Sequence, residues 1–396
     1  MSRPRSWNHL LGGLDAPAFL REHWQKRPLL VRGALPDPEP PLTAEELAGL
    51  ACEEEVESRL VLHPDVDTWE LRHGPIPEED FPRLPERDWT LLVQDVDKWV
   101  PEAAALLERF RFLPSWRRDD VMLSYAAPGG GVGPHWDDYD VFLVQLQGRR
   151  RWRIAHRFDR EALVPDCDLR ILSRLEPERE WILEPGDMLY LPPGVAHEGT
   201  AVDACLTASV GFRAASAAEM LTDLAGLLAQ RSGAGQRFAD PWRGDASADP
   251  GLIDDRSLET VRRLLQQAWA MAPGELETWF GRFITEPKPW LQPEPPAPLT
   301  REAFARLLAA DVPLALHPAS RLAHAEVAAG RHVLFADGRA HRLPPALVPL
   351  ARRICELCGA VPASHLEASG DAARTLLHAL YLQGTLLAGN EAAHER

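Results

Sequence analysis

The stretch that decides the fold reads PGGGVGPHWDDYDVFLVQLQGRRRWRI and covers residues 128–154. Its glycine-rich beginning leads into His135 and Asp137, which lie two residues apart. In a β-strand, residues i and i+2 face the same side, so these two side chains are expected to project together while Trp136 faces away. One His and one carboxylate on a shared face supply two ligands of the 2-His-1-carboxylate triad, which binds non-haem Fe(II) and leaves three coordination positions open.

A third ligand is expected further along the chain, in the segment EPGDMLYLPPGVAHEG at residues 184–199. A strand rises after one tight turn, and a second turn at Pro193-Gly194 delivers His197. An HxD motif alone is common, and a solvated polar turn is the competing interpretation. The combination of the glycine-rich approach, HxD, GRRRW and PGDxLYLPPGxxH favours a metal site made by His135, Asp137 and His197.

Residues 121–213 read as β structure, with many short apolar runs separated by Gly and Pro turns. This pattern is typical of a sandwich or barrel, and the jelly roll is the usual closed form. The chain between residue 34 and about residue 120 reads instead as proline-rich turns with short helices at 43–51 and 101–110. Asp15 is expected to cap an entry helix.

The pattern turns helical after Arg213, with helices expected at roughly 216–231, 256–271 and 273–284. A proline-dense segment at 286–298 is expected to act as a stiff linker. The last unit combines helices, including one near 370–387, with an Asp337-Gly338 hairpin signal, as a winged helix does. The predicted class is α+β, with domains at 1–213 (jelly roll), 214–290 (helical) and 291–396 (winged-helix-like).

Residues 121–213, together with the entry segment FLREHWQKRPLLVRG, resemble the JmjC-type 2-oxoglutarate-dependent oxygenases, and within them the bacterial ribosomal oxygenases. The helical section and the terminal unit match in order and length, so the resemblance covers essentially the whole chain. It implies a cupin-like double-stranded β-helix that uses Fe(II), 2-oxoglutarate and O2 and releases succinate and CO2. It also implies that an arginine of the large-subunit ribosomal protein numbered sixteen is hydroxylated.

Two alternatives stay open at this stage. The same chemistry could act on a histidine of another ribosomal protein, for which the wall of the substrate site would be shorter and flatter. The chain could also be a cupin-like module that binds a metal without turnover. Such a module would bind no 2-oxoglutarate.

The resemblance assigns the far carboxylate of 2-oxoglutarate to Arg150, which lies fifteen residues past His135. The planar guanidinium suits this role because it pairs with two carboxylate oxygens at once. If the chain turns at Gly148, strand alternation sends Arg150 inward and its two arginine neighbours outward. Ser124 resembles the family's second contact to 2-oxoglutarate, and Arg213 is a rival carboxylate partner.

The substrate side is less well defined by sequence. Tyr139 shares parity with the HxD ligands and is expected to line the interior beside the iron. Asp138 and Asp140 have the opposite parity and are interpreted as surface charge. The formal charge of −16 disfavours nucleic acid as the main partner and favours a basic protein substrate.

The remaining signals concern the surroundings of the enzyme. Five scattered cysteines indicate a reducing compartment, and the absence of an apolar leader or a long apolar stretch predicts a cytoplasmic protein with no membrane contact. Cys355 and Cys358 form a lone CxxC, interpreted as a packed helix end more than a zinc or redox site. Leucines at helical spacing after Arg213 predict a homodimer.

Overall fold

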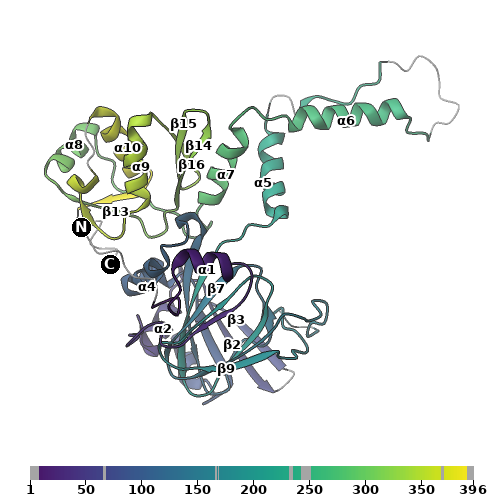
Figure 1. The fold of residues 1–396 in the computed structure, drawn as a ribbon, viewed down its shortest axis with the longest axis vertical. Coiled ribbons are helices and arrows are strands. Elements are labelled where there is room, and N and C mark those ends of the chain that lie inside the picture. Colours follow the sequence, from purple (N-terminus) through teal and green to yellow (C-terminus); the bar gives the residue numbers. More distant parts are fainter. Residues whose placement is uncertain are drawn as a thin grey trace. The chain divides into compact units, whose positions relative to one another are not determined.

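The computed structural model describes residues 9–65, 68–165, 167, 169–231, 235–241, 251–366 and 370–389 (Figure 1). The chain divides into two compact units where the strand-rich part gives way to helices, between Ala214 and Ala215. The second unit extends to Ala388. The finer division into three domains stays a prediction.

The first unit is built on an eight-stranded sheet. Its strands, in spatial order, are β1 (Leu29–Val31), β10 (Met188–Leu191), β7 (Asp140–Gln147), β12 (Cys205–Phe212), β5 (Arg118–Ala126), β4 (Trp89–Val93), β2 (Ser58–Asp65) and β3 (Thr68–His73). Neighbouring strands pair antiparallel throughout.

A second sheet has four strands. In spatial order these are β6 (His135–Trp136), β11 (Ala196–Ala201), β8 (Arg150–Ala155) and β9 (Arg179–Leu183). Apolar side chains from both sheets pack together, including Leu143 and Leu189 of the large sheet and Trp152 and Ile154 of the small one. The sides of the two sheets that carry these residues are called the inner faces below. The predicted jelly roll is confirmed.

Three strands of this unit were not predicted. β2, β3 and β4 lie in the region read as turns and short helices, and they extend the large sheet beyond β5. β3 has the sequence TWELRH, which is charged and half exposed, so it lacks the apolar alternation that reveals a strand. The two helices expected there do exist, as α2 (Ala44–Leu50) and α4 (Pro101–Leu107).

The outer face of the large sheet packs against the N-terminal helices. These are α1 (Ala16–Glu22), α2, α3 (Val96–Trp99) and α4. Asp15 caps α1 as predicted, because its carboxylate accepts a hydrogen bond from Ala18 N. Three short 3₁₀ turns complete the region, at Glu78–Arg83, Glu108–Phe110 and Ser115–Arg117.

The interpretation of Asp140 as surface charge was wrong. Its side chain is completely buried, accepts hydrogen bonds from Tyr190 Oη (2.6 Å) and Gln25 Nε2 (3.0 Å), and pairs with Arg117 (3.2 Å). Parity correctly placed Asp140 on the outer face, but the N-terminal segment covers that face. Asp140 therefore ties the entry segment to the start of β7, three residues past Asp137.

The second unit contains six helices and two small sheets among the described residues. The helices are α5 (Ala217–Ala229), α6 (Asp255–Trp269), α7 (Glu275–Thr285), α8 (Arg301–Ala309), α9 (Val348–Cys355) and α10 (Asp371–Leu382). One sheet has the strand order β17 (Val361–Pro362), β13 (Pro313–Leu316) and β18 (Leu386–Ala388). The other has the order β14 (Leu322–Ala328), β15 (Arg331–Ala336) and β16 (Arg339–Leu343). Two further 3₁₀ turns lie at Pro345–Leu347 and Ala363–Leu366. None of the described helices is long and apolar enough to cross a membrane.

Two sequence signals in this unit had different outcomes. Asp337 and Gly338 both have positive φ and join β15 to β16, as the hairpin signal predicts. The helix expected at 370–387 is shorter, because it ends at Leu382 and the chain forms β18 instead. Gly384 (φ +87°) makes this turn, where a Cβ would lie 2.7 Å from the carbonyl oxygen of Glu294.

Cys355 lies at the end of α9, where burial raises the pKa of its thiol to about 12. Cys358 is exposed, and neither forms a disulfide. A thiol that stays protonated at neutral pH is a poor nucleophile and a poor metal ligand. These properties agree with a packed helix end.

Candidate metal centre and cosubstrate site

Three of the predicted site residues meet on the small sheet. His135 on β6 and His197 on β11 are directly paired across the two strands, and their ring centroids lie 4.3 Å apart. Asp137 follows β6, and its Oδ2 lies 3.6 Å from His197 Nε2. One ligand atom of each of the three residues lies within 4.8 Å of the others. Among the described residues, this is the one such cluster of His, Cys, Asp or Glu.

Backbone carbonyls orient both imidazoles. His135 Nδ1 lies 2.9 Å from the Gly133 carbonyl oxygen, and His197 Nδ1 lies 3.0 Å from that of Val195. A carbonyl only accepts, so each Nδ1 must donate and each neutral ring keeps its Nε2 lone pair for a metal. Both rings are therefore prepared as ligands.

The protonation state of His197 also suits a metal. Burial, followed by the nearby His135 ring, lowers the pKa of His197 to about 4. The ring is therefore neutral at neutral pH, which is the form that coordinates a metal. Two neutral imidazoles and one carboxylate are the donor set of a non-haem Fe(II) site, so these residues fit the implied metal.

Gly133 explains part of the glycine-rich approach. Its φ is +77°, and a Cβ there would lie 2.8 Å from the Ile171 side chain and 3.0 Å from the Trp69 ring. Only glycine meets both demands without strain. The carbonyl that orients His135 therefore depends on the absence of a side chain at this position.

Arg150 lies on β8, on the same face as the histidines. It is 4% exposed, whereas its neighbours Arg149 and Arg151 are exposed, as strand alternation predicts. Arg150 Nη1 donates to Ser124 Oγ on β5 (3.1 Å), and Nη2 donates to the Gly199 carbonyl on β11 (3.2 Å). Its Nε is buried and has no hydrogen-bond partner among the described residues. A carboxylate is the natural acceptor for such a donor.

The structure separates the rival, Arg213, from this arrangement. Arg213 follows β12, and its backbone N–H donates to the Arg117 carbonyl oxygen. Thr207 of the same strand lies opposite Ser124. Six residues of strand separate Thr207 from Arg213, or roughly 20 Å. Ser124 and Arg150 are thus brought together, and Arg213 is not.

Tyr139 lies near the metal ligands, but the parity argument does not account for its position. β6 ends at Trp136, so residues 137–139 are not a strand and alternation does not apply. Tyr139 sits in a bend and is 43% exposed. It nevertheless interacts electrostatically with Asp137 and with Asp120. Its place beside the metal ligands therefore has a different cause from the one predicted.

Two inner-face residues, Asp120 and Trp152, were given no role from the sequence. Asp120 on β5 is buried, and one of its carboxylate oxygens would lie 3.1 Å from a Cβ added at Gly211. Trp152 on β8 is also buried, and its ring centroid lies 6.0 Å from that of His197. Strand alternation could have placed both on the inner face, because Asp120 lies four residues before Ser124 and Trp152 lies two residues after Arg150.

Comparison with known proteins agrees with this geometry. The JmjC domain family matches residues 105–220, and the ROXA-like winged helix family matches residues 263–386. The ribosomal protein uL16 3-hydroxylase of Escherichia coli is 41% identical over 285 residues, covering 72% of this chain and 75% of that protein. The chain belongs to the ribosomal oxygenase family. The recognition made from the sequence is confirmed.

Other relatives of this ribosomal oxygenase lead to the same conclusion. A probable ribosomal oxygenase of Haemophilus influenzae is 43% identical over 197 residues, covering 49% of this chain and 48% of that protein. A solved structure of an E. coli ribosomal oxygenase in complex with cobalt and 2-oxoglutarate is 34% identical, with a TM-score of 0.78. That match covers 95% of this chain and 98% of the E. coli chain.

Proposed function

We propose that this ribosomal oxygenase is an Fe(II)- and 2-oxoglutarate-dependent hydroxylase that acts on an arginine of a large-subunit ribosomal protein. One observation carries the proposal: a three-ligand cluster and a buried guanidinium with an unpaired Nε face the same interior. A metal would bind to the three-ligand cluster. A keto acid with a second carboxylate would bind to that metal at one end and to the guanidinium at the other. The E. coli relatives carry the names uL16 3-hydroxylase and ribosomal oxygenase, which supports the same assignment.

Each residue has a defined task in this proposal. His135, Asp137 and His197 hold the metal and leave positions open on it. Arg150, supported by Ser124, binds the far carboxylate of 2-oxoglutarate, orients the cosubstrate and takes no part in proton transfer. When bound, Fe(II), 2-oxoglutarate and O2 supply the oxidant that converts C–H to C–OH, with release of succinate and CO2. The apolar inner faces keep water away from this reaction.

Asp120 and Tyr139 favour arginine over histidine as the target. A bound arginine needs a wall for its aliphatic stem and an acceptor for its guanidinium. Tyr139 hydrogen-bonds with Asp137 and interacts electrostatically with Asp120, so an aromatic side chain and a second carboxylate lie near this metal ligand. A neutral histidine could donate one hydrogen bond to that carboxylate, whereas a guanidinium forms a stronger, charge-assisted bidentate pair with it. We therefore assign Tyr139 and Asp120 to the arginine side chain.

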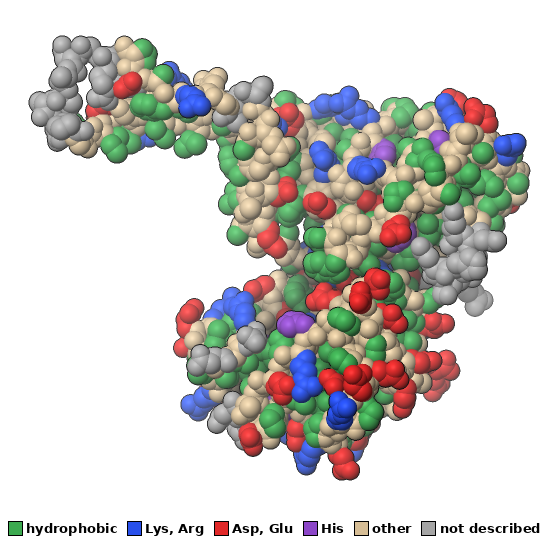
Figure 2. Space-filling view, turned by 180° about the vertical axis from the view of Figure 1, so that it is seen from behind, with side chains coloured by type: hydrophobic (Ala, Val, Ile, Leu, Met, Phe, Trp, Pro, Cys, Tyr) green, Lys and Arg blue, Asp and Glu red, His purple; other side chains and the backbone are tan. Residues whose placement is uncertain are grey.

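The distribution of charge supports a basic protein partner. Residues 1–214 contain 38 acidic and 25 basic residues, a net charge of −13, whereas the remaining residues contain 21 and 18. Figure 2 shows acidic side chains gathered over part of the jelly-roll unit. Such a field attracts basic proteins and speeds their association. We place this reaction in the cytoplasm, where ribosomal proteins are made.

Mass spectrometry of purified large-subunit ribosomal proteins, incubated with the enzyme, Fe(II) and 2-oxoglutarate, tests the function. We expect one protein to gain a single oxygen on arginine, and the His135→Ala enzyme to add none. A gain on histidine would keep the chemistry and replace the target. No gain and no succinate formation by iron-loaded enzyme would favour the non-catalytic metal-binding module.

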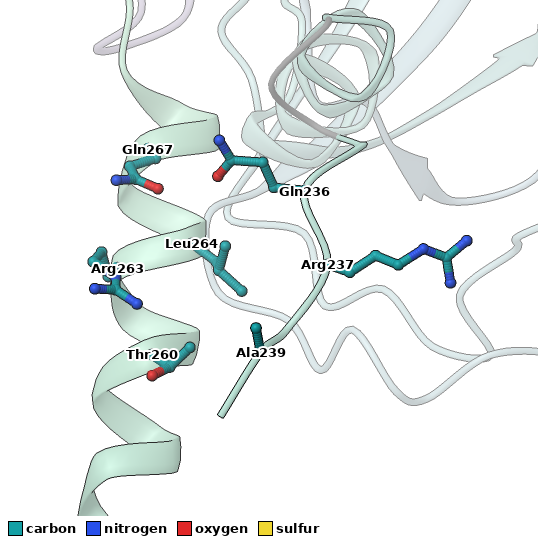
Figure 3. A pocket seen from close by; sticks show the side chains of 7 residues that line it. All are labelled: Gln236, Arg237, Ala239, Thr260, Arg263, Leu264 and Gln267. Atoms are coloured by element: carbon teal, nitrogen blue, oxygen red, sulfur yellow. The ribbon is translucent and has the colours of Figure 1, made fainter. Parts of the chain in front are cut away.

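Homodimerisation is proposed through α6. Leu258, Val261, Leu265 and Trp269 form one exposed apolar stripe on this helix. The opposite side of α6 faces another segment of the chain, because Thr260, Leu264 and Gln267 line a pocket together with Gln236 and Ala239 (Figure 3). A second copy of α6 offers the matching apolar surface around a two-fold axis.

Light scattering coupled to gel filtration tests the dimer. Leu265→Glu places a charge in the apolar stripe, so we expect the mass to fall to that of one chain. Glu259→Ala lies on another side of the helix and serves as the matched control. A Leu265→Glu protein that keeps the mass of two chains would contradict the role of α6.

A further inference from the structure

Trp152 shares the interior with Arg150 but has no role in the family resemblance drawn from the sequence. It lies on β8, two residues past Arg150, and is 5% exposed. Its strand partner on β11 is Gly199, and that pair lies between the pairs His197–Ile154 and Ala201–Arg150. Trp152 therefore stands between the metal ligand and the guanidinium.

The indole is in contact with the group that we assign to the cosubstrate. Arg150 Cζ lies over the Trp152 ring, 5.1 Å from its centroid. A guanidinium at this distance is attracted by the ring face, and the attraction is larger when both groups are buried. The ring therefore restricts the orientation of the guanidinium.

Gly199 makes room for this stack. A Cβ at Gly199 would lie 2.7 Å from Arg150 Nε and 2.7 Å from Cη2 of Trp152. Its φ is not in the left-handed region, so backbone conformation is not the reason for glycine here. The two side chains occupy the space that any other residue would need.

Both members of the stack carry a buried donor. Arg150 Nε and Trp152 Nε1 have no hydrogen-bond partner among the described residues. The large majority of buried side-chain polar atoms in native proteins are paired, so two unpaired donors in adjacent side chains of the interior point to a ligand rich in acceptor oxygens. A carboxylate fits both donors.

We propose that Trp152, seated on Gly199, is a positioning residue of the cosubstrate site. Its ring holds the Arg150 guanidinium ready for the far carboxylate, and its N–H donates to that same carboxylate. This inference rests on the function proposed above, since it takes 2-oxoglutarate as the ligand. It extends the site from the Arg150–Ser124 pair to a platform built on β8 and β11.

Calorimetric titration of the Co(II)-loaded protein with two ligands tests the proposal. Oxalate chelates the metal like the keto-acid end of 2-oxoglutarate but has no far carboxylate. We expect Trp152→Phe, which removes the N–H and weakens the ring contact, to bind 2-oxoglutarate about ten-fold more weakly. Oxalate affinity and Co(II) content are expected to stay within two-fold of the native values.

Trp181→Phe is the matched control. Trp181 lies on β9 directly opposite Trp152 of β8, and it packs against the same apolar cluster. It should change neither affinity. Gly199→Ala should repeat the selective loss by displacing the stack. Equal loss for both ligands, or unchanged 2-oxoglutarate affinity in Trp152→Phe, would overturn the positioning role. A native protein that binds oxalate but not 2-oxoglutarate would overturn the proposed function itself.

Discussion

The two ends of the jelly-roll interior are held in place in different ways. At the metal end, each imidazole is oriented by a carbonyl only two residues away, at Gly133 for His135 and at Val195 for His197. At the guanidinium end, Arg150 bonds to Ser124 and Gly199, which lie 26 and 49 residues away in the chain. The orientation of each histidine ligand is thus encoded locally, whereas the orientation of the guanidinium depends on the pairing of β8 with β11 and on contact with β5 of the other sheet.

The largest expected effect breaks the metal end. His135→Ala removes one of three ligands, so we expect loss of stoichiometric Co(II) binding and of all turnover. Metal content by atomic absorption and succinate formation are the measurements. His156→Ala is the control, because His156 is an exposed histidine paired with Glu178. Full activity in His135→Ala would refute the ligand assignment.

The second prediction concerns pH and the metal-free protein. His197 has a pKa of about 4 when folded and about 6.5 when unfolded, so the unfolded chain binds the proton more tightly between these values. The unfolding free energy should therefore fall as the pH drops from 6.5 to 4, by about 3 kcal/mol. Urea titrations across this range measure it. His197→Asn should flatten the dependence, and an unchanged slope in that variant would contradict the assignment.

The third prediction breaks the guanidinium end alone. Arg150→Ala removes a bidentate partner of the far carboxylate, so the KM for 2-oxoglutarate should rise by about 100-fold while Co(II) content is kept. The KM of Arg150→Lys should lie between those of the native enzyme and Arg150→Ala, because lysine keeps the charge but lacks the planar guanidinium. Arg151→Ala, in the exposed neighbouring position, should behave as the native enzyme. A parallel loss of metal would show that the two ends are not independent.

The smallest effect sharpens the claim that the orientation of each histidine ligand is locally encoded. Gly133→Ala strains a left-handed backbone and presses on Trp69 and Ile171, which shifts the carbonyl that orients His135. We expect about ten-fold weaker Co(II) binding in competition with a chelator. Gly330→Ala, at φ +68° with open space around it, imposes similar strain in the second unit. It should lower stability and leave metal affinity unchanged.

The same contrast explains how much could be predicted from the sequence. The jelly roll, the HxD ligands, His197 and the inward turn of Arg150 follow from local spacing and strand alternation, and the structure brings these residues together. Asp120 and Trp152 were given no role, because strand alternation places a residue on the inner face without showing which groups it contacts across the strands. β2, β3 and β4 were not predicted for a related reason. They extend the large sheet beyond β5, and it is the pairing with neighbouring strands that makes them strands.

Asp140 and Tyr139 mark where parity stops being informative. Asp140 does face outward, but it is buried because a distant segment covers that face. Tyr139 lies beyond the end of β6, a strand of only two residues, so strand alternation does not determine which way its side chain points. In both cases, tertiary packing and not strand alternation decides whether a side chain is buried.

The pairing of β8 with β11 works as a ruler. His197 lies opposite Ile154 and Arg150 lies opposite Ala201, so four residues of strand, or roughly 13 Å, separate the two ends of the ligand site. This length can change only in steps of two residues, because a slip of one would turn Arg150 to the outer face. A keto diacid of another length cannot be accommodated by small adjustments of the strands. Cosubstrate length is therefore selected by backbone register, and side-chain substitutions can tune only how firmly that one length is held.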